Sequence, residues 1–310
     1  MKLSPIIVFA YNRPIYLRQT LEALEKNAEF KDSKLYFFCD GPKLNATSSD
    51  LENIHEVRAL VREKKWCKDV TILESNSNKG LAESIINGVT MVLEEHNSVI
   101  VLEDDLVTSP YFLNFMNIAL NKYEQNDEVI AINGYNYPIK YEDNFPDTFF
   151  LKNADCFGWG TWKKKWDLFE RDASVLVKKI EAEGQSKEFD FDGQYPYMKM
   201  LKGVANGKIN SWAIRWYASC FVNNKISLFP KKSLVRNIGS IGTNFKADNK
   251  DILGWDIYPH PIAYYENKLV EDTESRKKCS KHFRKYNRRR LSLSSVKYFY
   301  KRFIYPNLAR

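Results

Sequence analysis

The sequence holds 310 residues, 44% of them hydrophobic and 14% aromatic, a composition that supports a substantial core and excludes extensive disorder. Its formal charge of +8 is unevenly spread, because the segment from Arg276 to Arg310 holds thirteen Lys and Arg and no acid. The rest of the chain carries 34 basic and 39 acidic residues. A mildly acidic body with a basic end excludes a nucleic-acid groove, which needs basic residues across its binding face.

The five cysteines are scattered and form no C-x-x-C motif, so they indicate a reducing compartment rather than a disulfide framework or a zinc site. No apolar run reaches the ~20 residues of a membrane span. The apolar run near the start suits a first strand and is too short for a signal peptide. We therefore expect a cytoplasmic protein.

Strands and helices are predicted to alternate in the first third of the chain. The strands are apolar runs at 6–10, 35–39, 70–73 and 99–102, as expected for strands buried on both faces. Helices are expected from Pro14, over 50–65, after Asn78 as a possible cap, and over 111–123. This alternation predicts an α/β fold whose central sheet is mostly parallel, with helices on both faces.

Polar side chains follow each of the four strands. Tyr11 and Arg13 come after the first strand, Asp40 after the second, Lys79 after the third, and the triplet Glu103-Asp104-Asp105 after the fourth. In open parallel sheets, ligands bind beyond the carboxyl ends of the strands. The sequence therefore predicts one site, built at this edge of the sheet.

The acidic triplet is the strongest chemical signal in the chain. Crowded carboxylates repel one another unless a cation lies between them, and hard oxygen ligands prefer magnesium or manganese to zinc. The alternative for the triplet alone is an acidic loop that caps the helix starting near Ser109. Because the chain has no Walker loop and no G-x-G-x-x-G motif, phosphates would be held by the metal with Arg13 and Lys79. Ordinary surface charge is the alternative for these two residues.

The second half is less regular. A strand is predicted at 129–132, followed by an aromatic segment at 156–166, an apolar stretch at 212–222 and a glycine-rich segment at 237–243. The spacing of Trp159, Trp162 and Trp166 suits one face of a helix. We expect Trp159 to line the site and the other two to lie in the core.

The ordered set of motifs resembles the glycosyltransferases of the GT-A fold. It is most similar to the branch that contains N-acetylglucosaminyltransferase I and bacterial surface-polysaccharide transferases. The motifs are FAYNRP at 9–14, CDG at 39–41, NKGL at 78–81, LEDD at 102–105, FGWGTW at 157–162, FDGQ at 191–194 and the segment 230–239. The resemblance implies a nucleotide-sugar-binding half over 1–106 and an acceptor-binding half over 107–270, before a basic tail over 271–310.

The resemblance also implies roles for the residues of the donor site. Asp105 would coordinate manganese or magnesium, while Glu103 and Asp104 would hold the ribose and the donor sugar. Tyr11 and Asp40 belong to the nucleotide part of the site, with Asp40 facing the base. Arg13 and Lys79 would lie near the pyrophosphate.

Asp192 stands where this branch places its catalytic base, and such a carboxylate takes the acceptor's proton during attack on the anomeric carbon. Asp190 is a rival two residues away, and the alternative for both is a place at the start of a helix. Relatives often carry a His after the glycine-rich segment, where this chain has Asn244. Metal ligation would then rest on Asp105, water and phosphates.

The function that the resemblance implies is a metal-dependent, inverting hexosyl- or N-acetylhexosaminyltransferase. It would move a sugar from a nucleotide-sugar, with a UDP-sugar expected, to a glycan or lipid-linked acceptor in bacterial surface polysaccharide synthesis. Two alternatives stay open. A sugar nucleotidyltransferase shares the sheet and the acidic site but usually carries a glycine-rich signature near its start. The other is a non-catalytic sugar- or membrane-binding protein.

The basic tail adds an expected contact with a membrane surface. Val296, Phe299, Tyr300 and Phe303 recur at helical spacing beside basic residues, and a basic amphipathic helix can lie on an anionic bilayer. The alternatives are a solvated tail or a helix packed on the body with its charges outward. We expect a cytoplasmic protein that is peripheral on the inner face of the membrane and has no nucleic-acid partner.

Overall fold

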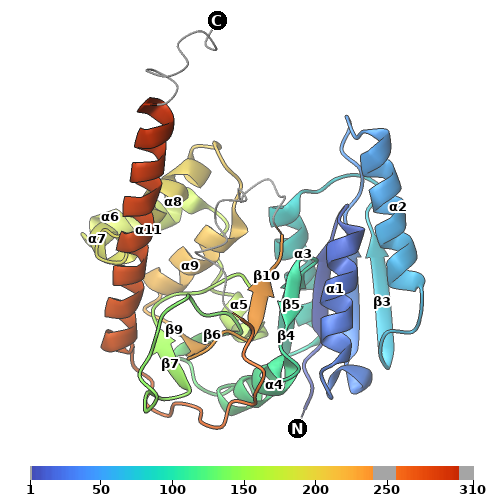
Figure 1. The fold of residues 1–310 in the computed structure, drawn as a ribbon, viewed down its shortest axis with the longest axis horizontal. Helices are drawn as coiled ribbons and strands as arrows, with labels where there is room; N and C mark the ends of the chain where they lie inside the picture. Colours follow the sequence, from blue (N-terminus) through green and yellow to red (C-terminus); the bar gives the residue numbers. More distant parts are fainter. Residues whose placement is uncertain (1, 240–255, 300–310) are drawn as a thin grey trace, which may run out of the picture.

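The computed structural model describes residues 2–239 and 256–299 (Figure 1). The elements run in this order: β1 (Ile6–Ala10), α1 (Pro14–Glu25), η1 (Phe30–Asp32), β2 (Lys34–Cys39), α2 (Ser48–Arg62), β3 (Asp69–Glu74), α3 (Leu81–Glu95), β4 (Ser98–Glu103), β5 (Leu106–Thr108), α4 (Phe112–Lys122), β6 (Val129–Asn133), β7 (Thr148–Leu151), β8 (Trp159–Trp162), α5 (Lys163–Trp166), α6 (Ala173–Ala182), α7 (Ser186–Phe189), α8 (Tyr197–Ala205), α9 (Trp212–Val222), β9 (Ile226–Pro230), β10 (Val235–Asn237) and α11 (Thr273–Phe299).

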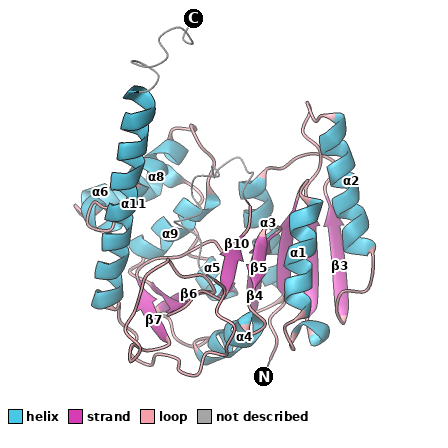
Figure 2. Ribbon diagram, in the orientation of Figure 1, coloured by secondary structure: helices cyan, strands magenta, loops and turns pink. Residues whose placement is uncertain are grey.

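One eight-stranded sheet runs through the described part of the molecule in the order β3-β2-β1-β4-β8-β6-β9-β7. Strands β3, β2, β1 and β4 are parallel, as are β6 and β9. Strand β8 enters antiparallel between β4 and β6, and β7 is antiparallel to β9. Helices lie on both sides of the sheet (Figure 2). The predicted α/β fold with a mostly parallel central sheet is therefore confirmed.

Strand β1 shows why the sheet has two apolar faces. Successive side chains of a strand point to opposite faces. Ile6 and Val8 join a core cluster with α1, α2 and α4, while Ile7 and Phe9 join another with α3 and α9. All five residues of β1 are buried, so the strand is a continuous apolar run.

The first four predicted strands, the strand at 129–132 and the helices between them are present within about three residues of their expected bounds. The prediction that Asn78 caps α3 is wrong, because Gly80, with φ of 78°, occupies the N-cap position. The Asn78 side chain instead donates a hydrogen bond to Asp40. The strands β5, β7, β8, β9 and β10 lie outside the predicted elements, since such short segments carry too few residues to show a period.

Trp159 lies in the core and not at the site, so that expectation is wrong. It is 0% exposed and packs against Trp166, Trp212 and Trp216, with ring centroids 5.2 to 5.8 Å apart. The segment at 159–162 is a strand, in which positions three apart point to opposite faces. Trp162 therefore joins the other core cluster. The burial expected for Trp162 and Trp166 is confirmed.

The first half of α11 packs on the body of the protein. Ser275, Cys279 and Phe283 are buried at intervals of four residues. The basic side chains of Lys277, Lys281 and Lys285 are exposed, which matches a packed helix with its charges outward.

The predicted apolar stripe of the tail lies outside the described side chains. Tyr300 and Phe303 follow the last described residue, and the side chains of Val296 and Phe299 are also not described. Within residues 2–239 and 256–299, none of the helices combines the length and the apolar character that a membrane crossing requires.

Replacing Trp159 with Ala should lower the free energy of unfolding by about 3–5 kcal/mol, because the change leaves a cavity among three other indoles. Urea denaturation followed by circular dichroism measures this loss. The control is Leu44→Ala at a fully exposed position, where we expect a change of no more than about 0.5 kcal/mol. Equal stability of the two variants would contradict the core position of Trp159.

Candidate functional site at the carboxyl edge of the sheet

The carboxyl ends of β1, β2, β3 and β4 lie at one edge of the sheet because these strands are parallel and in register. The segments that follow them therefore meet, as the sequence predicts. Direct contacts join Tyr11 and Arg13 to the acidic triplet. Asp40, which directly follows β2, contacts the backbone of Lys79 in the loop between β3 and α3.

Arg13 binds two carboxylates of the triplet. Its Nη1 donates to Asp105 Oδ2 at 2.6 Å, and its Nη2 donates to Asp104 Oδ1. The side chains of Asp104 and Asp105 are 3% and 8% exposed, against 25% for Arg13. Burial alone would lower the pKa of Arg13, but the charges of Asp104 and Asp105 raise it by more. The net shift is upward, so the guanidinium stays charged. One guanidinium thus balances two buried acids.

Glu103 is the member of the triplet that Arg13 does not bind. Burial, together with the charges of the neighbouring Asp105 and Asp104, raises the pKa of Glu103 to about 8. Burial also raises the pKa of Asp104, to about 6, although the charge of Arg13 opposes this rise. The Glu103 side chain makes no hydrogen bond or ion pair within the described part of the chain, although its backbone pairs with β1. Added positive charge at this point would favour its ionised form.

The segment after β10 encloses Asp105. The Ile238 amide donates to the Asp105 carbonyl at 2.9 Å, and Asn237 Nδ2 lies 3.4 Å from Asp105 Oδ1. A Cβ atom on Gly239 would lie 2.1 Å from Asp105 Oδ2, so only glycine fits there. The glycine-rich segment is visible in the sequence, but its contact with the triplet depends on the pairing of β10 with β5.

Tyr11 lies beside the triplet, because its backbone amide points to Asp104 Oδ2 at 3.4 Å. The Lys43 ammonium is 5.9 Å from the centroid of the Tyr11 ring. Asn12 ties the same loop to α2 through a 2.9 Å hydrogen bond to Asp50. The loop after β1 is therefore fixed from three directions.

Asp40 organises the loop that carries Lys79. Each of its carboxylate oxygens accepts two hydrogen bonds, with lengths of 2.8 to 3.0 Å, from the backbone amides of Gly41, Lys79 and Gly80 and from Asn78 Nδ2. These four hydrogen bonds fix the loop, and the expected contact of Asp40 with a nucleotide base stays a prediction. The Lys79 side chain is exposed.

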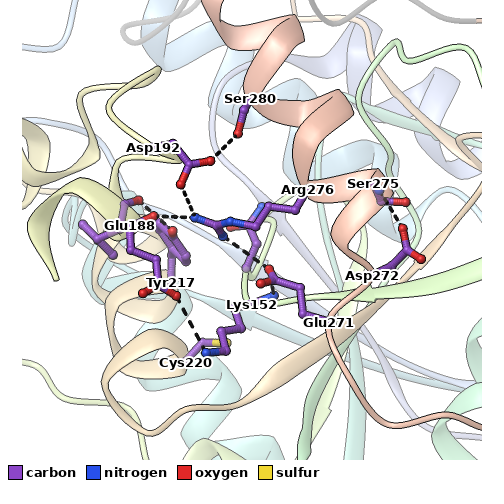
Figure 3. A network of polar contacts seen from close by, with 12 residues as sticks. Lys152, Glu188, Asp192, Tyr217, Cys220, Glu271, Asp272, Ser275, Arg276 and Ser280 are labelled. Atoms are coloured by element: carbon purple, nitrogen blue, oxygen red, sulfur yellow. Dashed lines mark hydrogen bonds and ion pairs between the residues drawn. The ribbon is translucent and has the colours of Figure 1, made fainter.

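Asp192 lies in the loop between α7 and α8, against α11. Its carboxylate accepts a hydrogen bond from Ser280 at 3.0 Å and pairs with Arg276 at 3.5 Å (Figure 3). The rival Asp190 accepts the Met198 amide at 2.6 Å, at the start of α8. Among the described residues, no hydrogen bond or ion pair joins either acid to the triplet. The base role of Asp192 therefore stays a prediction.

Asp155 is a carboxylate at this edge that the sequence analysis does not single out. It lies in the loop before β8, and its Oδ1 accepts the backbone amides of Cys156 and Phe157 at 2.8 and 3.0 Å. Its own amide donates to Asn133 at 3.0 Å. No motif marks Asp155, because only the antiparallel entry of β8 brings this loop to the edge.

The oxygen ligands here suit a cation that is shared with a ligand. Within the described residues, no three His, Cys, Asp or Glu side chains converge on one point. Asp105 and Glu103 offer carboxylate oxygens, and magnesium commonly binds one or two carboxylates together with waters and substrate phosphates. These residues fit a divalent cation held jointly with a phosphate, and not one held by the protein alone.

No protein-family model and no curated protein matches the sequence. Solved structures resemble parts of the chain. S. aureus TarS 1–349 shares 14% identity at a TM-score of 0.35, with 58% of this chain and 49% of that one covered. The mannosyltransferase PcManGT from Pyrobaculum calidifontis, solved with GDP-Man and Mn²⁺, shares 10% identity at a TM-score of 0.35. The match covers 71% of this chain and 74% of that one. Mouse xyloside xylosyltransferase 1 shares 12% identity at a TM-score of 0.35, and the match covers 67% of this chain and 84% of that one.

The match spans about half of the TarS chain. The mannosyltransferase and the xylosyltransferase are glycosyltransferases by name, the class that the motifs resemble. Such identities and TM-scores do not transfer an activity to this chain. Its function has to rest on the geometry of the site.

Replacing Arg13 with Met should lower the free energy of unfolding by about 3–5 kcal/mol, because two buried carboxylates lose their counter-charge. The matched control is Arg18→Met, whose pair with Glu63 is 47% and 45% exposed. We expect that change to cost no more than about 1 kcal/mol. Urea denaturation at pH 7.5 compares the two variants. If Arg13→Met costs no more than Arg18→Met, Arg13 does not hold the triplet together.

Proposed function

We propose that this chain is a glycosyltransferase that binds a nucleotide-sugar at the carboxyl edge of its sheet and passes the sugar to an acceptor hydroxyl. The observation that carries this proposal is the charge arrangement at that edge. Arg13 holds Asp104 and Asp105 next to Glu103, which lacks a partner among the described residues. Crowded acids beside exposed cations suit a ligand that combines phosphate with a divalent metal.

Lys79 and α3 support a diphosphate site. The Lys79 side chain is exposed directly before the N-terminus of α3, a helix of 15 residues with no side-chain cap. The first amides and the macrodipole of such a helix favour an anion. Arg13, still 25% exposed, follows β1 at the same edge of the sheet, with β2 between β1 and β3. The two cations would stabilise the nucleoside diphosphate as it leaves.

The transfer that we propose is a single displacement. The acceptor oxygen forms a bond to the anomeric carbon, while the bond from that carbon to the diphosphate breaks and its electron pair leaves with the diphosphate. A bound manganese or magnesium ion, with Asp105 and Glu103 as its protein ligands, would supply Lewis-acid stabilisation of the leaving group. Attack from the face opposite the leaving group gives inversion. We propose a UDP-sugar as the donor.

For the acceptor, we propose a glycan or a lipid-linked sugar at a membrane surface, as in bacterial surface polysaccharide synthesis. The support is the basic outer face of α11, where Lys277, Lys281 and Lys285 are exposed at intervals of four residues. Each basic residue near an anionic bilayer adds about 1 kcal/mol of attraction.

Thermal denaturation with nucleotides tests the donor site. We expect UDP or a UDP-sugar to raise the melting temperature only with MnCl₂, because a ligand of the native state stabilises it by mass action. Asp105→Asn should abolish this shift, and Asp143→Asn, at an exposed position, should keep it. Failure of UDP-, GDP-, CDP- and dTDP-linked ligands to shift the wild-type protein would overturn the proposal. Pyrophosphate release from a nucleoside triphosphate would favour a nucleotidyltransferase instead.

Vesicle sedimentation tests the membrane contact. The full chain should bind vesicles that contain phosphatidylglycerol and not vesicles of phosphatidylcholine alone. The triple variant Lys277→Glu, Lys281→Glu and Lys285→Glu should lose most of this binding, because three attractive charges become repulsive. The matched control reverses the charge of three exposed lysines elsewhere on the surface, with the changes Lys31→Glu, Lys68→Glu and Lys208→Glu. Equal binding of the two triple variants would exclude this face of α11.

A further inference from the structure

Strand β8 brings a segment of the second half to the proposed donor site. It runs antiparallel to β4, with Trp159 opposite Val101. The residues before β8 therefore run past the carboxyl end of β4, where Glu103 to Asp105 follow. Gly158 fixes this approach, because a Cβ atom there would lie 2.7 Å from the Val235 side chain of β10. Asp155 thus lies at the same edge as the triplet.

The Asp155 carboxylate is firmly oriented. Its Oδ1 accepts the amides of Cys156 and Phe157, and its backbone amide is held by Asn133 at the end of β6. The side chain of Tyr137 is a further hydrogen-bond partner of the carboxylate. Asp155, Cys156 and Phe157 are each half-buried as residues, and these contacts give the carboxylate a fixed orientation.

The charges around Cys156 connect Asp155 to the triplet. After burial, the largest causes that raise the pKa of the Cys156 thiol are the charges of Asp155 and Glu103, and Asp105 adds a smaller effect. The charges of both groups therefore act on this one thiol. A second feature is the buried Tyr135 hydroxyl, which has no hydrogen-bond partner among the described residues, and Asp155 is the charged group that affects it most.

We propose, on the basis of the function proposed above, that Asp155 is the catalytic base of the transfer. The acceptor hydroxyl gives its proton to the Asp155 carboxylate as its oxygen bonds to the anomeric carbon. The bond from that carbon to the diphosphate breaks at the same time, and the electron pair leaves on the diphosphate. The carboxylate then returns the proton to water.

Asp155 is a better candidate for the base than Asp192. The Asp192 carboxylate is 54% exposed and is engaged by Arg276 and Ser280 of α11. Its contacts hold α11 on the loop after α7. Asp155 instead lies in the loop that the sheet places beside the triplet.

The protonation of Asp155 suits this role. Burial raises the pKa of Asp155 to about 6. The hydrogen bonds from the amides of Phe157 and Cys156 and from Tyr137 lower the pKa, but by less. A base works only when ionised and works best with a pKa near the operating pH. The titratable groups that face it are the phenols of Tyr135, Tyr137 and Tyr197 and the thiols of Cys156 and Cys279.

The test compares Asp155→Asn with the wild-type chain. The amide oxygen of Asn can still accept the two backbone hydrogen bonds, so the variant removes the basic oxygen and keeps the turn. The assay measures release of UDP or GDP from UDP- and GDP-sugars, with octyl glycosides or water as the acceptor, since both must lose a proton. Thermal shifts by UDP or GDP with MnCl₂ report donor binding.

We expect Asp155→Asn to lower kcat by about 100-fold or more and to keep the nucleotide shift. The wild-type kcat/KM should rise with pH and level off above about 6, and the variant should lack this rise. Asp192→Asn, assayed in parallel, should keep more than half of kcat. Wild-type turnover that survives in Asp155→Asn, or that falls instead in Asp192→Asn, would overturn only the assignment of the base. Nucleotide binding with no turnover in the wild type would overturn the proposed function as well.

Discussion

The site depends on one guanidinium between two buried carboxylates. Asp104 and Asp105 are 3% and 8% exposed in their side chains, and uncompensated charges at such positions are costly. Arg13 is placed to balance them because β1 and β4 are parallel neighbours and both chains leave the sheet at the same edge. Pro14 starts α1 directly after Arg13 and limits how the loop can move. The remaining contacts of the site build on this pairing.

Two further constraints keep the triplet in place. The Thr20 hydroxyl donates to the Asp104 carbonyl at 2.9 Å, which ties the triplet to α1. On the other side, the short ribbon of β5 and β10 brings Gly239 so close to Asp105 that no side chain fits between them. The triplet is therefore held by elements from both ends of the described chain. A ligand that pulls Arg13 away from Asp105 would have to replace its charge.

The sequence predicts the first half of the site well, because buried parallel strands are apolar runs and their ends share one edge. Tyr11, Arg13 and the triplet meet as expected. The hydrogen bonds of Asp40 could not be predicted in the same way, since they depend on the conformation of a loop nearly forty residues away. Trp159 is a similar case, because three residues of separation mean one face of a helix but opposite faces of a strand.

The second half of the site is hidden from the sequence for a topological reason. A strand that enters antiparallel reverses which of its ends meets the ligand edge, so the residues before β8, and not those after it, reach the triplet. A search for polar residues after each strand cannot find Asp155. In the proposed transfer, the segments after the parallel strands would supply the cations and acids for a diphosphate, while the antiparallel strand adds a separately oriented carboxylate. Two substrates that must meet at one carbon need such contributions from two directions.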